Sequence, residues 1–252
     1  NKDYLKLLDG NYSRVFKKLG PLQFMKVKND IENGMPHTRG EYIVFSKSYF
    51  QKLSNLFTRN PHFLLDRENL HVVRLIAHER FHIFQRLYPK IMEEFYQKKW
   101  KLEPLTERLP SEILEVNRTN PDALPDKNWI FHIKDNNYIL PLCVYKSKHS
   151  DNINQTKNIY VEVTKNKDKV RFSNLKLDLT EKKLLINLKE FSEFFGYQGA
   201  NNYHPHEISA SLFEDAISAT IDKTQYNENE TSNLHKNSEA FSLLVDFFSN
   251  LN

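Results

Sequence analysis

Apolar side chains recur every three or four residues between Leu70 and Leu87, which is the spacing of one face of an α-helix. Charged and polar residues occupy most of the positions between them. Asp66 is placed to cap the start of this helix, and Pro89, which has no backbone N–H, ends it. The pattern predicts a largely buried helix before Pro89, followed by a second helix in "KIMEEFYQKKW".

The middle of the chain changes to short runs of β-branched, aromatic and apolar residues, separated by turns rich in Asn, Asp and Lys. These runs predict a small antiparallel sheet over residues 129–178. Another strand is expected from Gly40, in "GEYIVF", with a helix over 47–58 after it. Helical spacing predicts further helices in residues 4–20, "EKKLLINLKEFSEFFGY", "HPHEISASLFEDAISAT" and 237–250.

These elements together predict an α+β fold that is mainly helical. The chain has 252 residues, which is ample for one large domain with its own core. We therefore expect a single domain over residues 1–252, with the 129–178 sheet inserted between two helical parts. We expect this domain to be a monomer.

Composition excludes several classes of function. The formal net charge is +4, and Lys and Arg are spread along the chain, so no nucleic-acid-binding face is expected. The chain has 6 Gly and no glycine-rich phosphate loop, which argues against nucleotide-driven chemistry. Its one cysteine, Cys143, lies in an apolar run and is expected to be a buried thiol. Any metal must therefore bind through His, Asp or Glu.

The sequence says less about where the protein acts. No apolar run reaches the ~20 residues that span a bilayer, so no membrane span is expected. The chain begins with Asn1 and not with Met, from which we expect that an upstream segment was removed. These observations favour a soluble protein, with secretion or export as an open alternative.

One short motif in the predicted helix carries chemistry of its own: "HERFH", residues 78–82. Four residues of helix turn through about 400°, so His78 and His82 share a face, where two imidazoles can bind one zinc ion. Glu79 lies about 100° around the helix and can reach a water on the metal rather than the metal itself. Zinc lowers the pKa of such a water towards ~7, and a carboxylate can then take its proton. The alternative is a buried histidine pair that only makes hydrogen bonds.

The stretch "LIAHERFHIFQ" resembles the active-site helix of zincin metallopeptidases. The metzincin branch of these enzymes requires HExxHxxGxxH, but Gln85 replaces the glycine and Tyr88 the third histidine. The resemblance therefore implies the gluzincin branch, in which a glutamate from a later helix is the third ligand. It implies a zincin-like fold, one Zn²⁺ and a peptide or protein substrate. Through "AHERFHIFQRLYP" and "NPDALPDKNWIF", the chain is also similar to an uncharacterised group of HExxH proteins.

The third ligand is expected in "NNYHPHEISASLFEDA". Pro205 favours the first turn of a helix, so Glu207 would lie in that turn, with Ala210 on the same face. The pattern E-x-x-A-x-x-F, from Glu207 to Phe213, is similar to the third-ligand helix of gluzincin-like families. One alternative is that Glu207 only stabilises the helix start. Another is that the ligand is one of three nearby residues: His206, Glu214 or Asp215.

Other side chains are expected around the metal. A zinc hydrolase needs a donor for the developing oxyanion, and Tyr203 or His206 is the candidate, with His204 beside them. The ligating histidines need hydrogen-bond acceptors, and the candidates on the Glu207 helix are Glu214 and Asp215.

An N-terminal edge strand is expected before the motif helix, in "HTRGEYIVF", residues 37–45. The resemblance implies that such a strand binds the substrate backbone by strand addition. His37 and Arg39 flank the run and would then face the cleft. A plain core strand is the alternative.

The sequence thus predicts a zinc-dependent metallopeptidase in which His78, His82 and Glu207 bind Zn²⁺ and Glu79 is the general base. Two alternatives stay open. In one, a catalytically silent zincin-fold module serves only binding, and its zinc is structural or absent. In the other, the same zinc hydrolyses a bond that is not a peptide bond.

Overall fold

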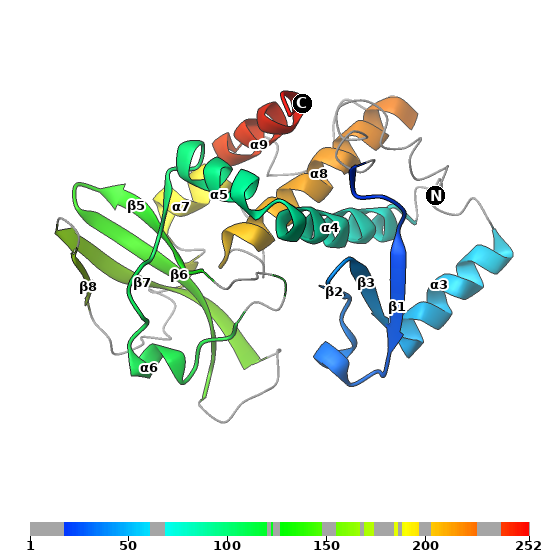
Figure 1. Ribbon diagram of the computed structural model, residues 1–252, viewed down its shortest axis with the longest axis horizontal. Coiled ribbons are helices and arrows are strands. Elements are labelled where there is room, and N and C mark those ends of the chain that lie inside the picture. The colour runs from blue at the N-terminus through cyan, green and yellow to red at the C-terminus, as the bar shows by residue number, and fades with distance from the viewer. Residues whose placement is uncertain are drawn as a thin grey trace. The chain divides into compact units, whose positions relative to one another are not determined.

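The computed structural model describes ten stretches of the chain, which contain both helices and sheets and belong to the α+β class (Figure 1). The described residues are 18–60, 69–119, 122, 127–147, 155–166, 169–173, 184–185, 188–196, 203–225 and 238–251. The chain divides into two compact units. The first is Asn1–Pro89, Ala210–Lys236 and Leu244–Asn252; the second is Lys90–Ser209 and Asn237–Leu243. A single catalytic domain over residues 1–252 stays a prediction.

Three strands form the sheet of the first unit, in the order β1-β3-β2: β1 (Gln23–Val27), β2 (His37–Arg39) and β3 (Tyr42–Ser46). β1 is parallel and β2 antiparallel to β3. The strand expected from Gly40 is β3, and it is central in this sheet. Its last four residues are all buried, as in a strand that is covered on both faces. An edge strand was expected over residues 37–45. Of that run, the part that lies at an edge of the described sheet is the shorter β2.

Helix α3 (Lys47–Arg59) follows β3 without a loop, as the sequence predicted for residues 47–58. The side chain of Ser46 accepts a hydrogen bond from the backbone N–H of Tyr49 at 3.4 Å, which caps the helix start. A short 3-10 helix, η1 (Ile31–Gly34), lies between β1 and β2 in sequence.

The predicted motif helix is α4 (Leu70–Leu87), and it packs against α8 (Pro205–Gln225) and α9 (Glu239–Ser249). The ring centroid of Phe81 on α4 lies 4.6 Å from that of Phe213 and 5.4 Å from that of Phe248. This aromatic contact holds the first unit's part of α8 on the motif helix.

The motif helix ends where the sequence predicted. Tyr88 is its last cap residue, and Pro89 begins α5 (Pro89–Lys98). The expected helix over residues 4–20 lies almost wholly outside the described residues, and the expected cap at Asp66 also lies outside them.

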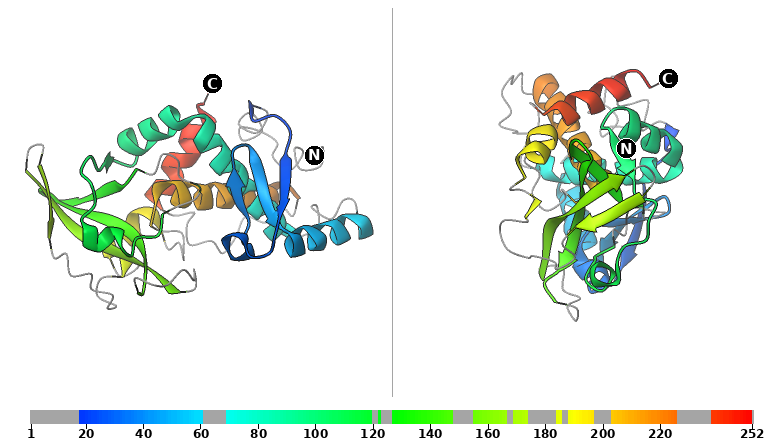
Figure 2. Two further views of the ribbon diagram at one scale, coloured as in Figure 1. Left: turned by 60° about the horizontal axis from the view of Figure 1, so that its bottom comes forward. Right: turned by 90° about the vertical axis from the view of Figure 1, so that its left-hand side faces the viewer.

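The second unit contains a five-stranded antiparallel sheet in the order β4-β5-β6-β7-β8 (Figure 2). Four of these strands confirm the sheet that the sequence predicted: β5 (Trp129–Lys134), β6 (Asn137–Tyr145), β7 (Thr156–Asn166) and β8 (Lys169–Ser173). The fifth, β4 (Leu102–Pro104), was not predicted, because three residues carry too little alternation to be recognised.

Both faces of this sheet are covered. Ile130 and alternate residues of β6 pack into one cluster with Ile113 of the short helix α6 (Ser111–Leu114). Phe131 faces the other way, and its ring lies 5.4 Å from Phe191 of α7 (Lys189–Phe195). α7 is shorter than the helix expected from residue 181, because Leu184 instead bridges to β7.

Helix α8 begins in the second unit and continues into the first. Its first turns are held in the second unit by α5, since the Tyr96 hydroxyl lies 2.8 Å from Oγ of Ser209. Ala210, the next residue, is fully buried in the first unit. Within the described ranges, no helix combines the length and apolar character that crossing a bilayer requires.

Candidate metal centre

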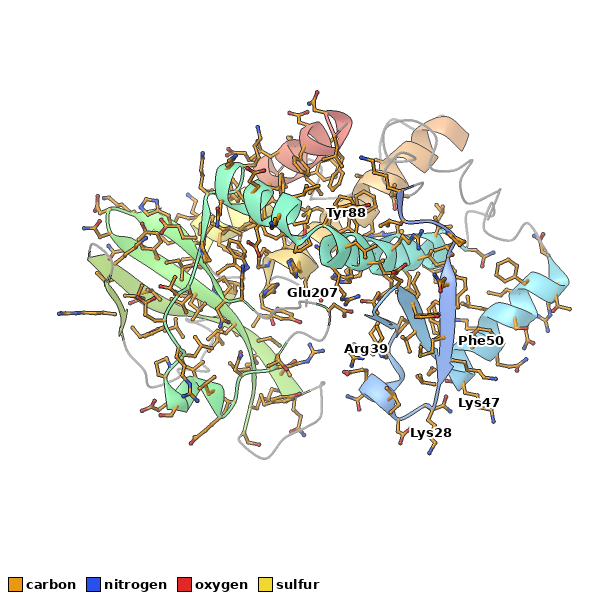
Figure 3. All side chains as sticks on the ribbon, viewed as in Figure 1. Lys28, Arg39, Lys47, Phe50, Tyr88 and Glu207 are labelled. Atoms are coloured by element: carbon orange, nitrogen blue, oxygen red, sulfur yellow. The ribbon has the colours of Figure 1, made fainter. Side chains whose placement is uncertain are left out.

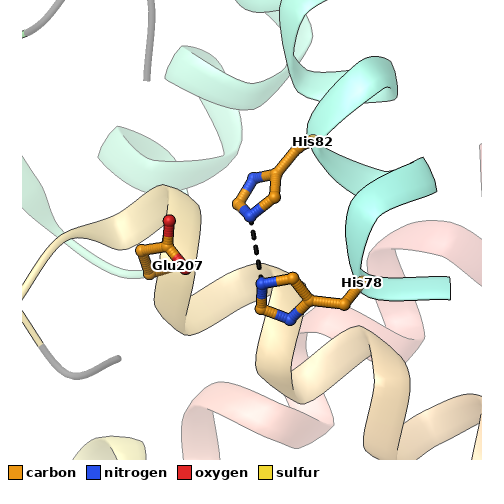
Figure 4. A group of neighbouring side chains, drawn as sticks. All are labelled: His78, His82 and Glu207. Carbon is orange, nitrogen blue, oxygen red and sulfur yellow. Dashed lines mark hydrogen bonds between the residues drawn. The ribbon is translucent and has the colours of Figure 1, made fainter. Parts of the chain in front are cut away.

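The two motif histidines face each other from successive turns of α4. His78 and His82 are both buried, and their Nε2 atoms lie 3.1 Å apart (Figure 4). Two nitrogens that bind one tetrahedral zinc at about 2.0–2.1 Å would be about 3.3 Å apart. The spacing that the helix imposes is therefore close to the spacing that a shared metal needs.

The other nitrogen of each imidazole has an oxygen partner. Nδ1 of His82 lies 2.7 Å from Oε1 of Gln85, and Nδ1 of His78 lies 3.3 Å from Oε2 of Glu214. A carboxylate only accepts, so Nδ1 of His78 carries a proton in this contact. The 3.1 Å between the two Nε2 atoms is also a hydrogen-bond distance, marked by the dashed line in Figure 4, in which one Nε2 donates to the other. A hydrogen-bonded histidine pair is the alternative that the sequence left open. A shared metal would instead use the lone pairs of both Nε2 atoms, and the donor set of the group could hold one.

Glu214 is itself held by Arg74, which lies on α4 one turn before His78. One guanidinium nitrogen of Arg74 bonds Oε1 of Glu214 at 2.9 Å and Oδ1 of Asp215 at 2.8 Å. Burial alone would raise the pKa of Glu214, but the hydrogen bonds and charges of His78 and Arg74 outweigh it and lower the pKa. The carboxylate is therefore ionised at neutral pH. Glu214 and Asp215 were the two candidates on α8 for a hydrogen-bond acceptor of the ligating histidines. Glu214 fits this role, whereas Asp215 accepts a hydrogen bond from Arg74.

Glu207 lies in the first turn of α8 and is 7 % exposed. Its carboxylate and the ring nitrogens of His78 and His82 offer ligand atoms that all lie within 4.8 Å of one another. Figure 4 shows the three side chains facing one another from α4 and α8. All three are buried, which sets them apart from the exposed acidic clusters that are common on protein surfaces. Their role as ligands stays a prediction.

Glu79 is buried beside the histidines on α4, with 4 % of its surface exposed. Burial first, and then the negative charge of Glu79, raise the pKa of Tyr49 on α3. The carboxylate therefore lies near the start of α3 within the first unit. Its role as a base is not decided by this position.

Tyr203 lies directly before α8 and is buried. Burial, and then the charge of Glu207, raise its pKa well above the usual value, while the cation of Arg118 acts in the opposite direction. The phenol is therefore neutral at physiological pH and can donate a hydrogen bond. Arg118 is fixed to β6, since its backbone N–H donates to the Cys143 carbonyl at 2.8 Å.

The two histidines before Glu207 lie in the second unit and contact other groups there. Nδ1 of His204 accepts a hydrogen bond from the backbone N–H of His206 at 3.2 Å, and its Nε2 lies 3.0 Å from the Lys127 carbonyl. His204 therefore holds the start of α8 to a neighbouring loop. The ring of His206 lies 5.6 Å from that of Tyr96. The oxyanion roles expected of Tyr203 and His206 stay predictions.

The side chains of His37 and Arg39 make contacts within residues 32–39. Nδ1 of the buried His37 lies 3.0 Å from the Met35 carbonyl, and Arg39 forms an ion pair with Glu32 at 2.9 Å. From α4, Arg86 contacts this segment: it donates to Oγ1 of Thr38 at 2.8 Å and to the carbonyl of Gly40 at 2.9 Å.

Sequence reasoning missed the partners Gln85 and Arg74. From the sequence, Gln85 was noted only because it breaks the metzincin pattern, yet in the structure it contacts and orients His82. Its position three residues after His82 was the available signal, because such neighbours on a helix are within reach. Arg74 lies four residues before His78, but its two acidic partners come from a distant helix and leave no local signal.

Comparison with known proteins identifies no relative: no family model matches the chain, and no curated protein or solved structure matches it.

Proposed function

We propose that the chain is a zinc-dependent metallopeptidase with a zincin-like, glutamate-ligated site. The observation that carries this proposal is the buried group His78, His82 and Glu207, whose ligand atoms lie within 4.8 Å of one another. Glu79, a buried carboxylate, follows directly after the first of these residues. Three protein ligands leave a fourth position for a reactant, as in catalytic zinc sites.

His78, His82 and Glu207 would hold the ion. When bound, zinc polarises a carbonyl and lowers the pKa of water towards ~7. The donor chemistry supports an ion of this kind, because imidazole and carboxylate ligands suit zinc and the Nδ1 contacts hold both Nε2 atoms toward one point.

Glu79 would move the proton. Its carboxylate accepts a proton from the water whose oxygen forms a new bond to the carbonyl carbon of the substrate. When the carbon–nitrogen bond then breaks, Glu79 gives the same proton to the departing amine. The carboxylate is thereby regenerated, and no oxidant or other co-reactant is needed.

Tyr203 would stabilise the oxyanion that forms on the carbonyl oxygen. Because burial keeps its hydroxyl protonated, the phenol can donate a hydrogen bond across the physiological pH range. His206 is the second candidate for this role. The two are separable by mutation, since Tyr203→Phe removes only a hydroxyl group.

The decisive experiment combines metal analysis with digestion of a broad peptide library. We expect about one zinc per chain, the stoichiometry of a single catalytic site, and cleavage that a chelator stops. His78→Ala should lose both, whereas Glu79→Gln should keep the metal and lose cleavage. Glu41→Gln, at an exposed glutamate, is the matched control.

Three results would contradict parts of this proposal. A wild-type protein purified without chelator and free of metal would refute the metal centre. If the protein binds zinc but cleaves no peptide, the remaining functions are a binding module or a hydrolase that acts on another kind of bond. Undiminished cleavage by Glu79→Gln would remove Glu79 from the mechanism.

A further inference from the structure

A second surface of the first unit, separate from the metal centre, combines exposed aromatic residues with lysines. On α3, Phe50 is 37 % exposed and Phe57 is 47 % exposed. They are seven residues apart and so share a side of the helix, with Lys47 three residues before Phe50 on that side. Figure 3 shows Lys47 and Phe50 on α3 and Lys28 just beyond β1.

Strand β1 adds to this surface. Phe24 is 43 % exposed, and Lys26 lies two residues further on the same side of the strand. The ammonium of Lys26 lies 5.8 Å from the ring centroid of Phe50, which joins β1 to α3. We call the set the basic aromatic face: Phe24, Lys26, Lys28, Lys47, Phe50 and Phe57.

The charged members of the basic aromatic face are all lysines, and the exposed Asp30 lies two residues after Lys28. Neither β1 nor α3 contains an Asp or a Glu. The ion pairs found among the described residues of the chain do not include Lys26, Lys28 or Lys47. A partner of this face therefore has to supply negative charge and also accept bulky apolar side chains.

We propose that the basic aromatic face docks on the surface of a membrane that contains anionic phospholipids. An amphipathic helix with Phe on one side and Lys at its borders lies in the plane of a bilayer interface. Lysines are attracted to anionic headgroups and keep their ammonium groups in water while their stems follow the apolar side chains. Protein interfaces, in contrast, are depleted in Lys and enriched in Arg. The three cations of this face are all lysines.

This docking is peripheral and reversible, and it does not depend on the metal. Each lysine near an anionic surface changes the membrane affinity about fivefold at low salt. Two or three such residues with two or three inserted aromatic rings give binding that salt weakens. Docking would hold the first unit at the membrane surface.

The test is sedimentation of the full chain with vesicles of phosphatidylcholine alone or mixed with phosphatidylserine. We expect binding to the mixed vesicles, weaker binding at high salt, and none to phosphatidylcholine alone. The variant Lys26→Gln with Lys47→Gln should bind about 25-fold more weakly, since two lysine contributions are lost. Phe50→Ser should bind about tenfold more weakly, because one ring no longer inserts.

Matched controls lie in the second unit. Lys134→Gln removes an exposed lysine and Leu114→Ser an exposed apolar side chain, and both should bind like the wild type. The lysine variant leaves apolar packing unchanged, so it stays informative if Phe50→Ser unfolds. Circular dichroism checks the fold of each variant.

Three outcomes would overturn the proposal: no binding of the folded wild type to mixed vesicles, equal binding by the double lysine variant, or equal binding to both kinds of vesicle. If the wild type does not bind vesicles but binds a single-stranded oligonucleotide, the face is assigned to nucleic acid. If it instead self-associates and the lysine variant does not, the face is assigned to a second copy of the chain. Vesicle binding should persist when a chelator is present. The docking proposal and the proposed metal centre can therefore fail independently of each other.

Discussion

Nδ1 of His78 on α4 lies 3.3 Å from Oε2 of Glu214 on α8. In this contact Nδ1 donates and the carboxylate accepts, so the ring of His78 is held with its Nε2 toward His82. Arg74 holds the other carboxylate oxygen at 2.9 Å. A chain of arginine, carboxylate and imidazole therefore orients one of the proposed ligands.

The first prediction concerns this chain. Glu214→Ala should weaken zinc binding about 10- to 100-fold, because His78 loses the acceptor that orients it and raises its basicity. Competition with a chelator of known affinity measures the change. Asp246→Asn, on α9, is the control and should bind like the wild type. An unchanged affinity in Glu214→Ala would show that the contact does not support the metal.

A second prediction concerns Gln85, whose Oε1 lies 2.7 Å from Nδ1 of His82. Gln85→Met keeps the length of the side chain but removes the oxygen acceptor, so zinc affinity should fall about 10- to 100-fold. Gln85→Glu keeps an acceptor and should retain affinity. Calorimetric titration of zinc into the metal-free proteins distinguishes the two. Equal losses in both variants would point to packing rather than hydrogen bonding.

A third prediction links the metal to stability. Zinc that binds only the folded chain stabilises it by about 2.7 kcal/mol when its free concentration is 100 times the dissociation constant. We expect a higher midpoint of thermal unfolding with zinc than with chelator. His82→Ala should abolish this difference. If the variant keeps the full difference, zinc binds elsewhere.

The fourth prediction tests the packing between α4 and α8. The Phe213 ring is fully buried and lies 4.6 Å from Phe81. Phe213→Ala should lower the free energy of unfolding by about 3–5 kcal/mol, since it leaves a cavity in the aromatic cluster. Urea unfolding measures it. Leu114→Ala, at an exposed site, should change stability by less than ~0.5 kcal/mol. A loss this small in Phe213→Ala would contradict the observed contact.

A fifth prediction concerns Cys143. Burial raises the pKa of its thiol, although Thr156 and Arg118 lower it in part. In the native protein at pH 8 the thiol should resist a thiol-specific reagent, and unfolding should expose the chain's one thiol. Above the ordinary thiol pKa of about 8.5 the unfolded chain loses this proton first, so the free energy of unfolding falls as pH rises. Rapid native labelling would contradict this burial.

The local pattern was informative wherever a structure depends on neighbours in sequence. The apolar spacing of α4, the proline that begins α5 and the alternating runs of β5 to β7 are of this kind. β1 and β4 were missed because their short runs have no clear alternation, and their pairing partners lie elsewhere in the chain. Residues 37–45 were expected to form one edge strand, but they fold as two: β2 lies at an edge, and the larger part of the run lies in the central β3, whose neighbours were not readable from its own residues.

For the candidate site, the sequence by itself determined the spacing of His78 and His82, because four residues are one turn of any helix. It also singled out Glu207, through Pro205 and the start of a helix. Only the tertiary structure decided what surrounds these side chains. Contacts between α4 and α8 depend on the packing of the whole core, so the carboxylate beside His78 could be nominated from the sequence, but only the fold could place it there.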